Sequence, residues 1–166
     1  GSSADAVMKI WDVGTGQEMS TISFKASGRN ARLIAISPDS RNVVTTEGSL
    51  QFWRLPEGTL ERSIELNAPP NGAIGAEMLP AFSPDGKLLA VVGEGGNFVQ
   101  IRDASTGAPV VRLAHGGPMG IGGCRFAEDG KKCVTSGIDG IARVWEVPSG
   151  RALSPALQQG GDILAG

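Results

Sequence analysis

One group of side chains in this sequence has the composition of a hydrolytic site. The 166 residues include a single histidine, His115, and Ser136 and Asp139 follow it within the same part of the chain. A catalytic histidine needs a nucleophile and an orienting acid, and this set contains one of each. The competing interpretation is structural, because the same polar groups can satisfy the N–H of a buried tryptophan, here Trp145. Which interpretation applies depends on the elements that hold these residues.

The metal-ligating residue types are few and scattered. Two cysteines and one histidine are too few for a Cys/His metal site, and no CxxC motif occurs. The carboxylates Asp39, Asp85 and Asp129 lie in three separate segments, each beside a glycine or serine. Aspartate at such positions typically forms turns. We therefore predict no metal and no cofactor.

Cys124 and Cys133 flank the segment 127–130 (AEDG) symmetrically. If residues 127 and 130 pair across the turn, Cys124 should face Cys133 on the neighbouring strand. A disulfide is geometrically conceivable there. Free buried thiols in a reducing cytoplasm are the favoured interpretation.

Nucleotide, nucleic-acid and membrane binding are not predicted. The segment 93–97 (GEGGN) is glycine-rich, but it precedes a strand and carries no Lys-Ser/Thr for phosphate. The three tryptophans have even spacing and apolar neighbours, which indicates core positions rather than a base-stacking platform. A net charge of −2 leaves no electrostatic footprint for nucleic acid or an anionic membrane. Because no signal peptide or membrane-length apolar run is visible, we expect a cytoplasmic location.

The elements that must position these residues repeat along the chain. Four segments superpose, at intervals of 42, 49 and 43 residues, and are centred on Trp11, Trp53, Arg102 and Trp145. Each of these segments is followed by a two-residue pair that ends in glycine. Between them lie turn segments with apolar flanks at 37–40, 83–86 and 127–130. A period near 45 residues therefore holds four short strands, named a to d, with tight a–b and c–d hairpins.

These motifs resemble those of the WD-repeat family. The resemblance is carried by SPDG, by the strand ends KIWDV and RVWEV, and by IDGIARVW. It implies an all-β fold, a β-propeller arc of four-stranded antiparallel blades. It also implies that each blade is tied by a His in the d–a loop, a Ser or Thr on strand b, an Asp in the b–c turn and a Trp on strand c. The last blade offers His115, Ser136, Asp139 and Trp145, and the first offers Ser2, Asp5 and Trp11.

The resemblance therefore favours a structural network over catalysis, and we expect no enzyme activity. The middle blades depart from the family pattern. The second has Glu47-Gly48 where Asp-Gly is expected, and Arg54 follows its Trp53. The third has Arg102 in place of tryptophan. We expect neither blade to hold the complete set of His, Ser or Thr, Asp and Trp.

The whole chain is expected to form one propeller segment. The predicted divisions are a partial blade at 1–24, blades at 25–66, 72–114 and 117–157, and the start of a further blade at 158–166. Propellers of this family usually close with seven or eight blades. Two interpretations stay open: the chain is a piece of a longer protein, or two copies self-associate to complete one ring.

The resemblance implies a non-catalytic scaffold for protein–protein interaction, because blades hold their loops rigidly and the loops carry contacts. Expected contact residues in the d–a and b–c loops are Arg29, Asn71, Glu94, Asn97 and Met119. Two alternatives remain. The TG-x-P phrases resemble repeats in large bacterial chains joined to Ser/Thr kinase domains, which implies a sensory or regulatory segment, although no kinase motif is present. A propeller hydrolase would need polar groups from several blades converging on the ring axis, and the sequence offers none.

Overall fold

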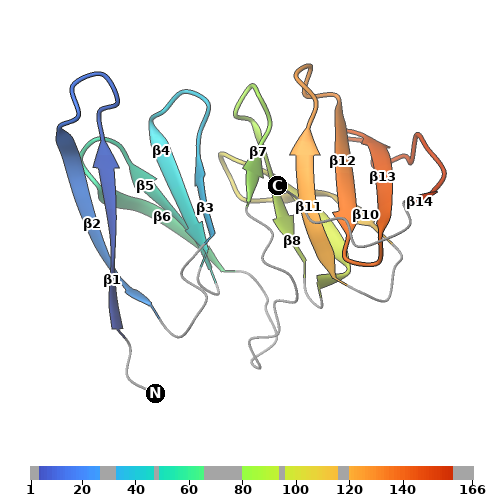
Figure 1. The fold of residues 1–166 in the computed structure, drawn as a ribbon, viewed down its shortest axis with the longest axis horizontal. Helices are drawn as coiled ribbons and strands as arrows, with labels where there is room; N and C mark the ends of the chain where they lie inside the picture. Colours follow the sequence, from blue (N-terminus) through green and yellow to red (C-terminus); the bar gives the residue numbers. More distant parts are fainter. Residues whose placement is uncertain are drawn as a thin grey trace. The chain divides into compact units, whose positions relative to one another are not determined.

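The described strands form antiparallel sheets only. The computed structural model describes residues 4–26, 33–46, 49–65, 80–93, 96–115 and 120–158. Within these ranges the strands make one two-stranded sheet and three four-stranded sheets, and none of them is closed (Figure 1). The predicted all-β class with four-stranded antiparallel blades is confirmed, and the sheets are those of a partial β-propeller.

The chain divides into two compact units, Gly1–Leu66 and Asn67–Gly166. The first unit holds the two-stranded sheet of β1 (Ala4–Trp11) and β2 (Glu18–Ala26), and the sheet of β3 (Leu33–Ile36), β4 (Asn42–Thr46), β5 (Ser49–Arg54) and β6 (Thr59–Glu65). The second unit holds the sheet of β7 (Ala81–Phe82), β8 (Leu88–Val92), β9 (Phe98–Asp103) and β10 (Pro109–Ala114), and the sheet of β11 (Ile121–Phe126), β12 (Lys132–Gly137), β13 (Ile141–Glu146) and β14 (Leu157–Gln158). Strand order follows chain order in every sheet, as in consecutive hairpins.

Each unit has its own apolar core between two sheets. In the first unit Trp53 and Val43 pack against Met8 and Ile22, which belong to β1 and β2. In the second unit one cluster joins β8 to β13, and its buried members are Ala90, Val99, Ile101, Leu113, Ile121, Cys124, Cys133, Trp145 and Val147. Successive strand residues point to opposite faces, so each sheet buries alternate residues against its neighbour.

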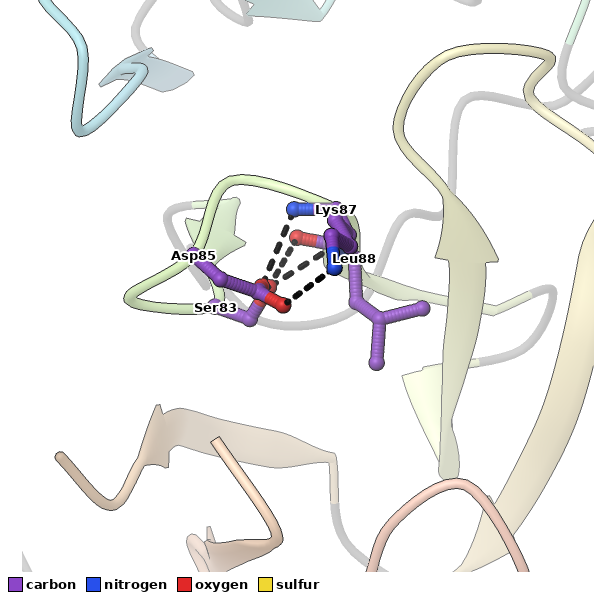
Figure 2. Close-up of polar contacts among 4 residues, drawn as sticks. All are labelled: Ser83, Asp85, Lys87 and Leu88. Atoms are coloured by element: carbon purple, nitrogen blue, oxygen red, sulfur yellow. Dashed lines mark hydrogen bonds and ion pairs between the residues drawn. The ribbon is translucent and has the colours of Figure 1, made fainter. Parts of the chain in front are cut away.

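The a–b hairpins turn on a serine and an aspartate that bond to each other. The Ser83 hydroxyl donates to Asp85 Oδ1 at 2.7 Å and accepts the Leu88 amide at 2.9 Å, while Asp85 Oδ1 also accepts the Lys87 amide at 3.1 Å (Figure 2). These bonds lower the pKa of Asp85, the Ser83 hydroxyl being the largest cause. Gly86 takes the left-handed conformation, with φ of 72°.

The turn of the first unit repeats this geometry. Ser37 donates to Asp39 at 2.6 Å and accepts the Asn42 amide at 2.9 Å. The left-handed position is filled by Ser40, with φ of 58°, where the other two a–b turns have glycine. The sequence pattern SPDG is thus a local device that closes the hairpin without help from the core.

The c–d hairpins turn on the residue that follows each anchor, the name used here for Trp11, Trp53, Arg102 and Trp145. The carbonyl groups of Asp12, Arg54, Asp103 and Glu146 each accept an amide at 2.8 Å from the glycine four residues later. At Asp103 the carboxylate also accepts bonds from the amides and hydroxyls of Ser105 and Thr106. These bonds lower the pKa of Asp103 to about 2, with the Ser105 hydroxyl as the largest cause. The acidic residue after the anchor thus caps the turn at Asp12 and Asp103, whereas the second sheet has Arg54 at this position.

Candidate functional site

A buried polar group ties β12, β13 and the end of β10 together. The indole N–H of Trp145 donates to Thr135 Oγ1 at 2.8 Å, and Thr135 Oγ1 lies 2.9 Å from His115 Nδ1. His115 and Thr135 have no exposed surface, and Trp145 is buried as well. The Thr135 hydroxyl thus lies between the indole N–H and the imidazole Nδ1.

Asp139 lies on the other side of the imidazole. Its Oδ1 is 3.8 Å from His115 Nε2, beyond a hydrogen bond, and it accepts the Ile141 amide at 3.1 Å. Burial lowers the pKa of His115, and the nearby Asp139 charge opposes this only in part. His115 Nε2 and Asp139 Oδ2 are buried and have no hydrogen-bond partner among the described residues. The set is closed to solvent, unlike a group that must meet a substrate.

The structure brings together three of the four residues expected in the last blade and corrects the fourth. The hydroxyl that meets Trp145 belongs to Thr135 and not to Ser136. Strand parity explains the difference: Cys133 is the register partner of Trp145, and Thr135, two residues on, faces the same side. Ser136 lies on the opposite face, half-buried. Alternation along KCVTSG was the signal that could have identified Thr135.

Gly137 allows the group to close. A Cβ built there would lie 2.7 Å from His115 Nε2 and closer still to Asp139 Oδ1. Any side chain at this position would push the histidine and the carboxylate apart. The glycine is therefore needed for close approach, and its φ is not in the left-handed region.

The other four-stranded sheets hold reduced versions of the group. In the first unit Trp53 Nε1 donates to Thr45 Oγ1 at 3.0 Å, with Val43 opposite the tryptophan. Residues 47 and 48, expected to depart from the Asp-Gly pattern, lie outside the described residues. In the sheet of β7 to β10 the anchor Arg102 donates to the carbonyl of Gly107 at 2.9 Å. Val91 occupies the position of Thr135 there, so no hydroxyl is present to receive a tryptophan.

The residues expected to form the network of the first blade are described only in part. Ser2 and the side chain of Asp5 lie outside the described residues. Trp11 ends β1 and is 53% exposed, whereas Trp53 and Trp145 are 8% and 6% exposed. Lys9 stacks over the Trp11 ring, with its ammonium 5.7 Å from the centroid. The indole N–H of Trp11 has no hydrogen bond to any residue that the structure describes.

The two cysteines are free and buried. The expected register of their hairpin is wrong: Cys124 pairs with Thr135, and Phe126 pairs with Cys133. The reason lies in the turn, where residue 127 pairs with 132 rather than 130, because Gly130 and Lys131 belong to the loop. Cys124 and Cys133 nevertheless lie diagonally on one face. The Cys124 thiol donates to Cys133, which together with burial raises the pKa of Cys124.

Of the five expected partner-contact residues, only Asn97 falls within the described residues, and it is exposed. Arg29, Asn71, Glu94 and Met119 lie outside them. In the described ranges no group of three or more His, Cys, Asp or Glu side chains is placed to hold a metal ion. Across the same ranges there is no helix of the length and apolarity needed to cross a membrane.

Comparison with known families identifies the repeat. Residues 107–146 match the family model described as WD domain, G-beta repeat. The match runs from the c–d turn at Gly107 through β10, β11 and β12 to the end of β13, so it contains His115, Thr135, Asp139 and Trp145. No curated protein matched the chain. The expected resemblance to WD-repeat proteins is confirmed, and the WD repeat is in general a non-catalytic module for protein interaction.

Proposed function

We propose that this chain is a non-catalytic scaffold that binds a protein partner through the loops at one rim of its blades. The observation that carries the proposal is the match of residues 107–146 to the WD repeat, which is a protein-interaction module. Within each sheet the antiparallel order places a–b and c–d turns at one end. The described ends of the strands that lead into the b–c turns and the d–a connections lie at the other end. These turns and connections are here named the binding rim.

The polar groups that could perform catalysis support this proposal rather than hydrolysis. His115 and Thr135 are fully buried and bonded to each other, and the hydroxyl of Thr135 already accepts from Trp145. A serine-type mechanism needs an accessible nucleophile beside the histidine. The same contacts are well suited to fixing His115 at the end of β10, which leads into the segment 116–119 that carries the expected contact residue Met119.

The experiment is affinity capture by the full chain, followed by quantitative binding of the captured partner to rim variants. Charge reversal by Arg29→Glu with Glu94→Lys should weaken binding at least tenfold. The matched control reverses two exposed residues of the a–b turns, Lys87→Glu with Glu128→Lys, and should leave binding within twofold. Equal losses in both pairs, or loss in the control alone, would show that the wrong rim is assigned.

The competing hydrolase function has a separate test. The chain is assayed with generic ester, phosphate and peptide substrates, together with His115→Ala. Turnover that is abolished by His115→Ala in a folded protein would replace the scaffold proposal. Turnover that survives the substitution would indicate a contaminant.

A further inference from the structure

Two thiols meet in the apolar core of the second unit. Cys124 lies on β11 and Cys133 on the neighbouring β12, and both belong to one buried cluster (Figure 1). Cys124 pairs with Thr135, which lies two residues beyond Cys133 on β12. The two cysteines are therefore diagonal neighbours on one face of the hairpin. The Cys124 thiol donates to the Cys133 sulfur, so the two side chains are in contact.

This contact makes the two thiols chemically unequal. The hydrogen bond lowers the pKa of Cys133, which accepts it. The same bond raises the pKa of Cys124, which donates it, and burial raises that pKa further. Because the thiolate is the form that attacks an oxidant, Cys133 is the nucleophile of the pair and Cys124 is the thiol that reacts second.

The strand that carries Cys124 is an edge of its sheet. β11 pairs with β12 alone, in the order β11-β12-β13-β14. Its register with β12 shifts between Ile121 and Gly123, and Gly122 and Gly123 come directly before the cysteine. A register shift and two glycines weaken the ladder between two strands. Local opening of β11 therefore admits a small oxidant to the buried pair.

We propose that Cys124 and Cys133 form a redox switch, which a hydroperoxide closes to an intrachain disulfide and a thiol reductant opens again. With hydrogen peroxide, the Cys133 thiolate attacks one oxygen, the O–O bond breaks and a sulfenic acid forms. The departing hydroxide takes up the proton that Cys133 has lost and becomes water. The Cys124 sulfur then attacks the sulfenic sulfur, and the S–S bond forms as the hydroxyl group leaves with the Cys124 proton as a second water. Both sulfurs are oxidised, and both peroxide oxygens are reduced.

Closing the bond changes the position of β11. Diagonal neighbours on a hairpin have Cα atoms about 7–8 Å apart. A disulfide joins Cα atoms about 5.5–6 Å apart, so β11 must move along β12 towards the a–b turn. The Ile138 amide donates to the Gly120 carbonyl at 2.9 Å, and this movement draws the carbonyl away from the amide. The cost of the movement makes the bond easy to reduce, which is the property of a regulatory disulfide rather than a structural one.

Peptide mapping of the full chain tests the chemistry. The chain is treated with excess hydrogen peroxide under native conditions, and remaining thiols are alkylated before digestion. Tryptic cleavage after Arg125 and Lys132 places the two cysteines on separate peptides. We expect these peptides as a linked pair from a chain whose mass without reductant stays at 17.1 kDa, and we expect dithiothreitol to separate them.

Two variants test the order of the steps, with folding checked by urea unfolding. Cys124→Ala leaves Cys133 without a second thiol, so oxidation should stop at a sulfenic acid that dimedone traps. Cys133→Ala removes the acceptor of the hydrogen bond but not the burial, so Cys124 should stay a thiol at the same peroxide concentration. Equal trapping in both variants would contradict the assignment of Cys133 as the attacking thiol.

Tryptophan fluorescence and hydrogen exchange test the structural change. Cys133 is the register partner of Trp145, and a disulfide beside an indole quenches its emission. Oxidation should therefore lower the fluorescence of the chain, and Trp145→Phe should abolish this loss. Trp53→Phe is the matched control and should retain the loss, because Val43 is the register partner of Trp53. Amide exchange at Ile138 should become about tenfold faster on oxidation.

Three results would overturn the proposal. The first is a pair that reacts only at urea concentrations that unfold the chain, because the native pair is then closed to the oxidant. The second is a linkage between two chains instead of within one. The third is unchanged exchange at Ile138 in a fully oxidised sample, because the bond would then form without moving β11.

Discussion

At the scale of single residues, the threonine between histidine and tryptophan determines how the last blade is held. Thr135 Oγ1 accepts from Trp145 and contacts His115 Nδ1, so removing it leaves two buried polar groups without a partner. A buried polar group without a partner lowers the free energy of unfolding by more than the lost hydrogen bond contributed, because neither group can reach water. Most of the group's contribution to stability therefore depends on one hydroxyl.

Thr135→Val should lower the free energy of unfolding of this unit by about 2 kcal/mol, because shape is kept and only the hydroxyl is lost. Thr135→Ser retains the hydroxyl and should cost clearly less. Urea unfolding monitored by tryptophan fluorescence measures both. Equal costs for the two variants would mean that packing of the methyl group, and not the hydrogen bonds, is what matters.

Gly137→Ala should destabilise the same unit by at least about 2 kcal/mol, because the added methyl group collides with His115 and Asp139. Gly14→Ala is the matched control, since its Cβ would meet only Asp12 Oδ1, at 3.4 Å. The control should be close to neutral in the same unfolding measurement. A neutral Gly137→Ala would contradict the close approach of histidine and carboxylate.

The histidine also predicts a pH dependence with a definite sign. Burial lowers the pKa of His115 in the folded chain below its ordinary value of 6.5. Between that value and the folded-state pKa the unfolded chain binds more protons, so stability rises with pH and is lost as pH falls below 6.5. The urea midpoint should fall between pH 7.5 and 5.5, and His115→Gln should flatten this change. A midpoint that rises on acidification would mean that Asp139 dominates over burial.

At the scale of elements, local hydrogen bonds close the a–b hairpins. Substitutions that interchange the residues of two such turns measure how much these bonds contribute to stability. Ser83 supplies a hydroxyl that Asp85 and the Leu88 amide both use, whereas the equivalent turn at 127–130 has Ala127 in that position. Ser83→Ala should cost about 1 kcal/mol of unfolding free energy, and Ala127→Ser should be neutral or stabilising. Both are checked by thermal unfolding. A destabilising Ala127→Ser would show that the three turns are not equivalent.

The hairpins were predictable from the sequence because their signals are local. Serine, aspartate and glycine at fixed offsets specify a turn wherever the chain goes next, and the anchors at Trp11, Trp53 and Trp145 repeat at blade spacing. Register was less predictable. Two additional loop residues, Gly130 and Lys131, moved the pairing so that Cys124 faces Thr135 instead of Cys133. A shift of this kind is set by turn geometry, which residue types alone define poorly.

The same limit explains the misassigned hydroxyl. Two adjacent hydroxyl residues, Thr135 and Ser136, both fit the expected position in the chain. Only the register opposite Trp145 decides which of them shares its face. Sequence spacing therefore located the buried group to within one residue, and strand pairing was needed to complete it. Trp11 shares the local sequence context of the buried tryptophans, but it lies in a two-stranded sheet where no second described strand covers it.

At the scale of the molecule, the proposed role rests on rigid blades that present loops. The predicted blade divisions, with boundaries at residues 24, 66, 114 and 157, stay a prediction, as do the fragment and two-copy interpretations of the chain. The solution mass measured by light scattering separates the last two. A uniform particle of twice the 17.1 kDa chain mass supports a two-copy assembly, and a polydisperse sample contradicts it.

The proposed function requires a protein partner to bind at the binding rim. Hydrogen exchange of the complex with a captured partner reads both ends of every described sheet in one experiment. We expect slowed exchange in the b–c turns and d–a connections, including the segment around Asn97, with the a–b and c–d turns unchanged. Slowed exchange confined to the a–b and c–d turns would overturn the proposal.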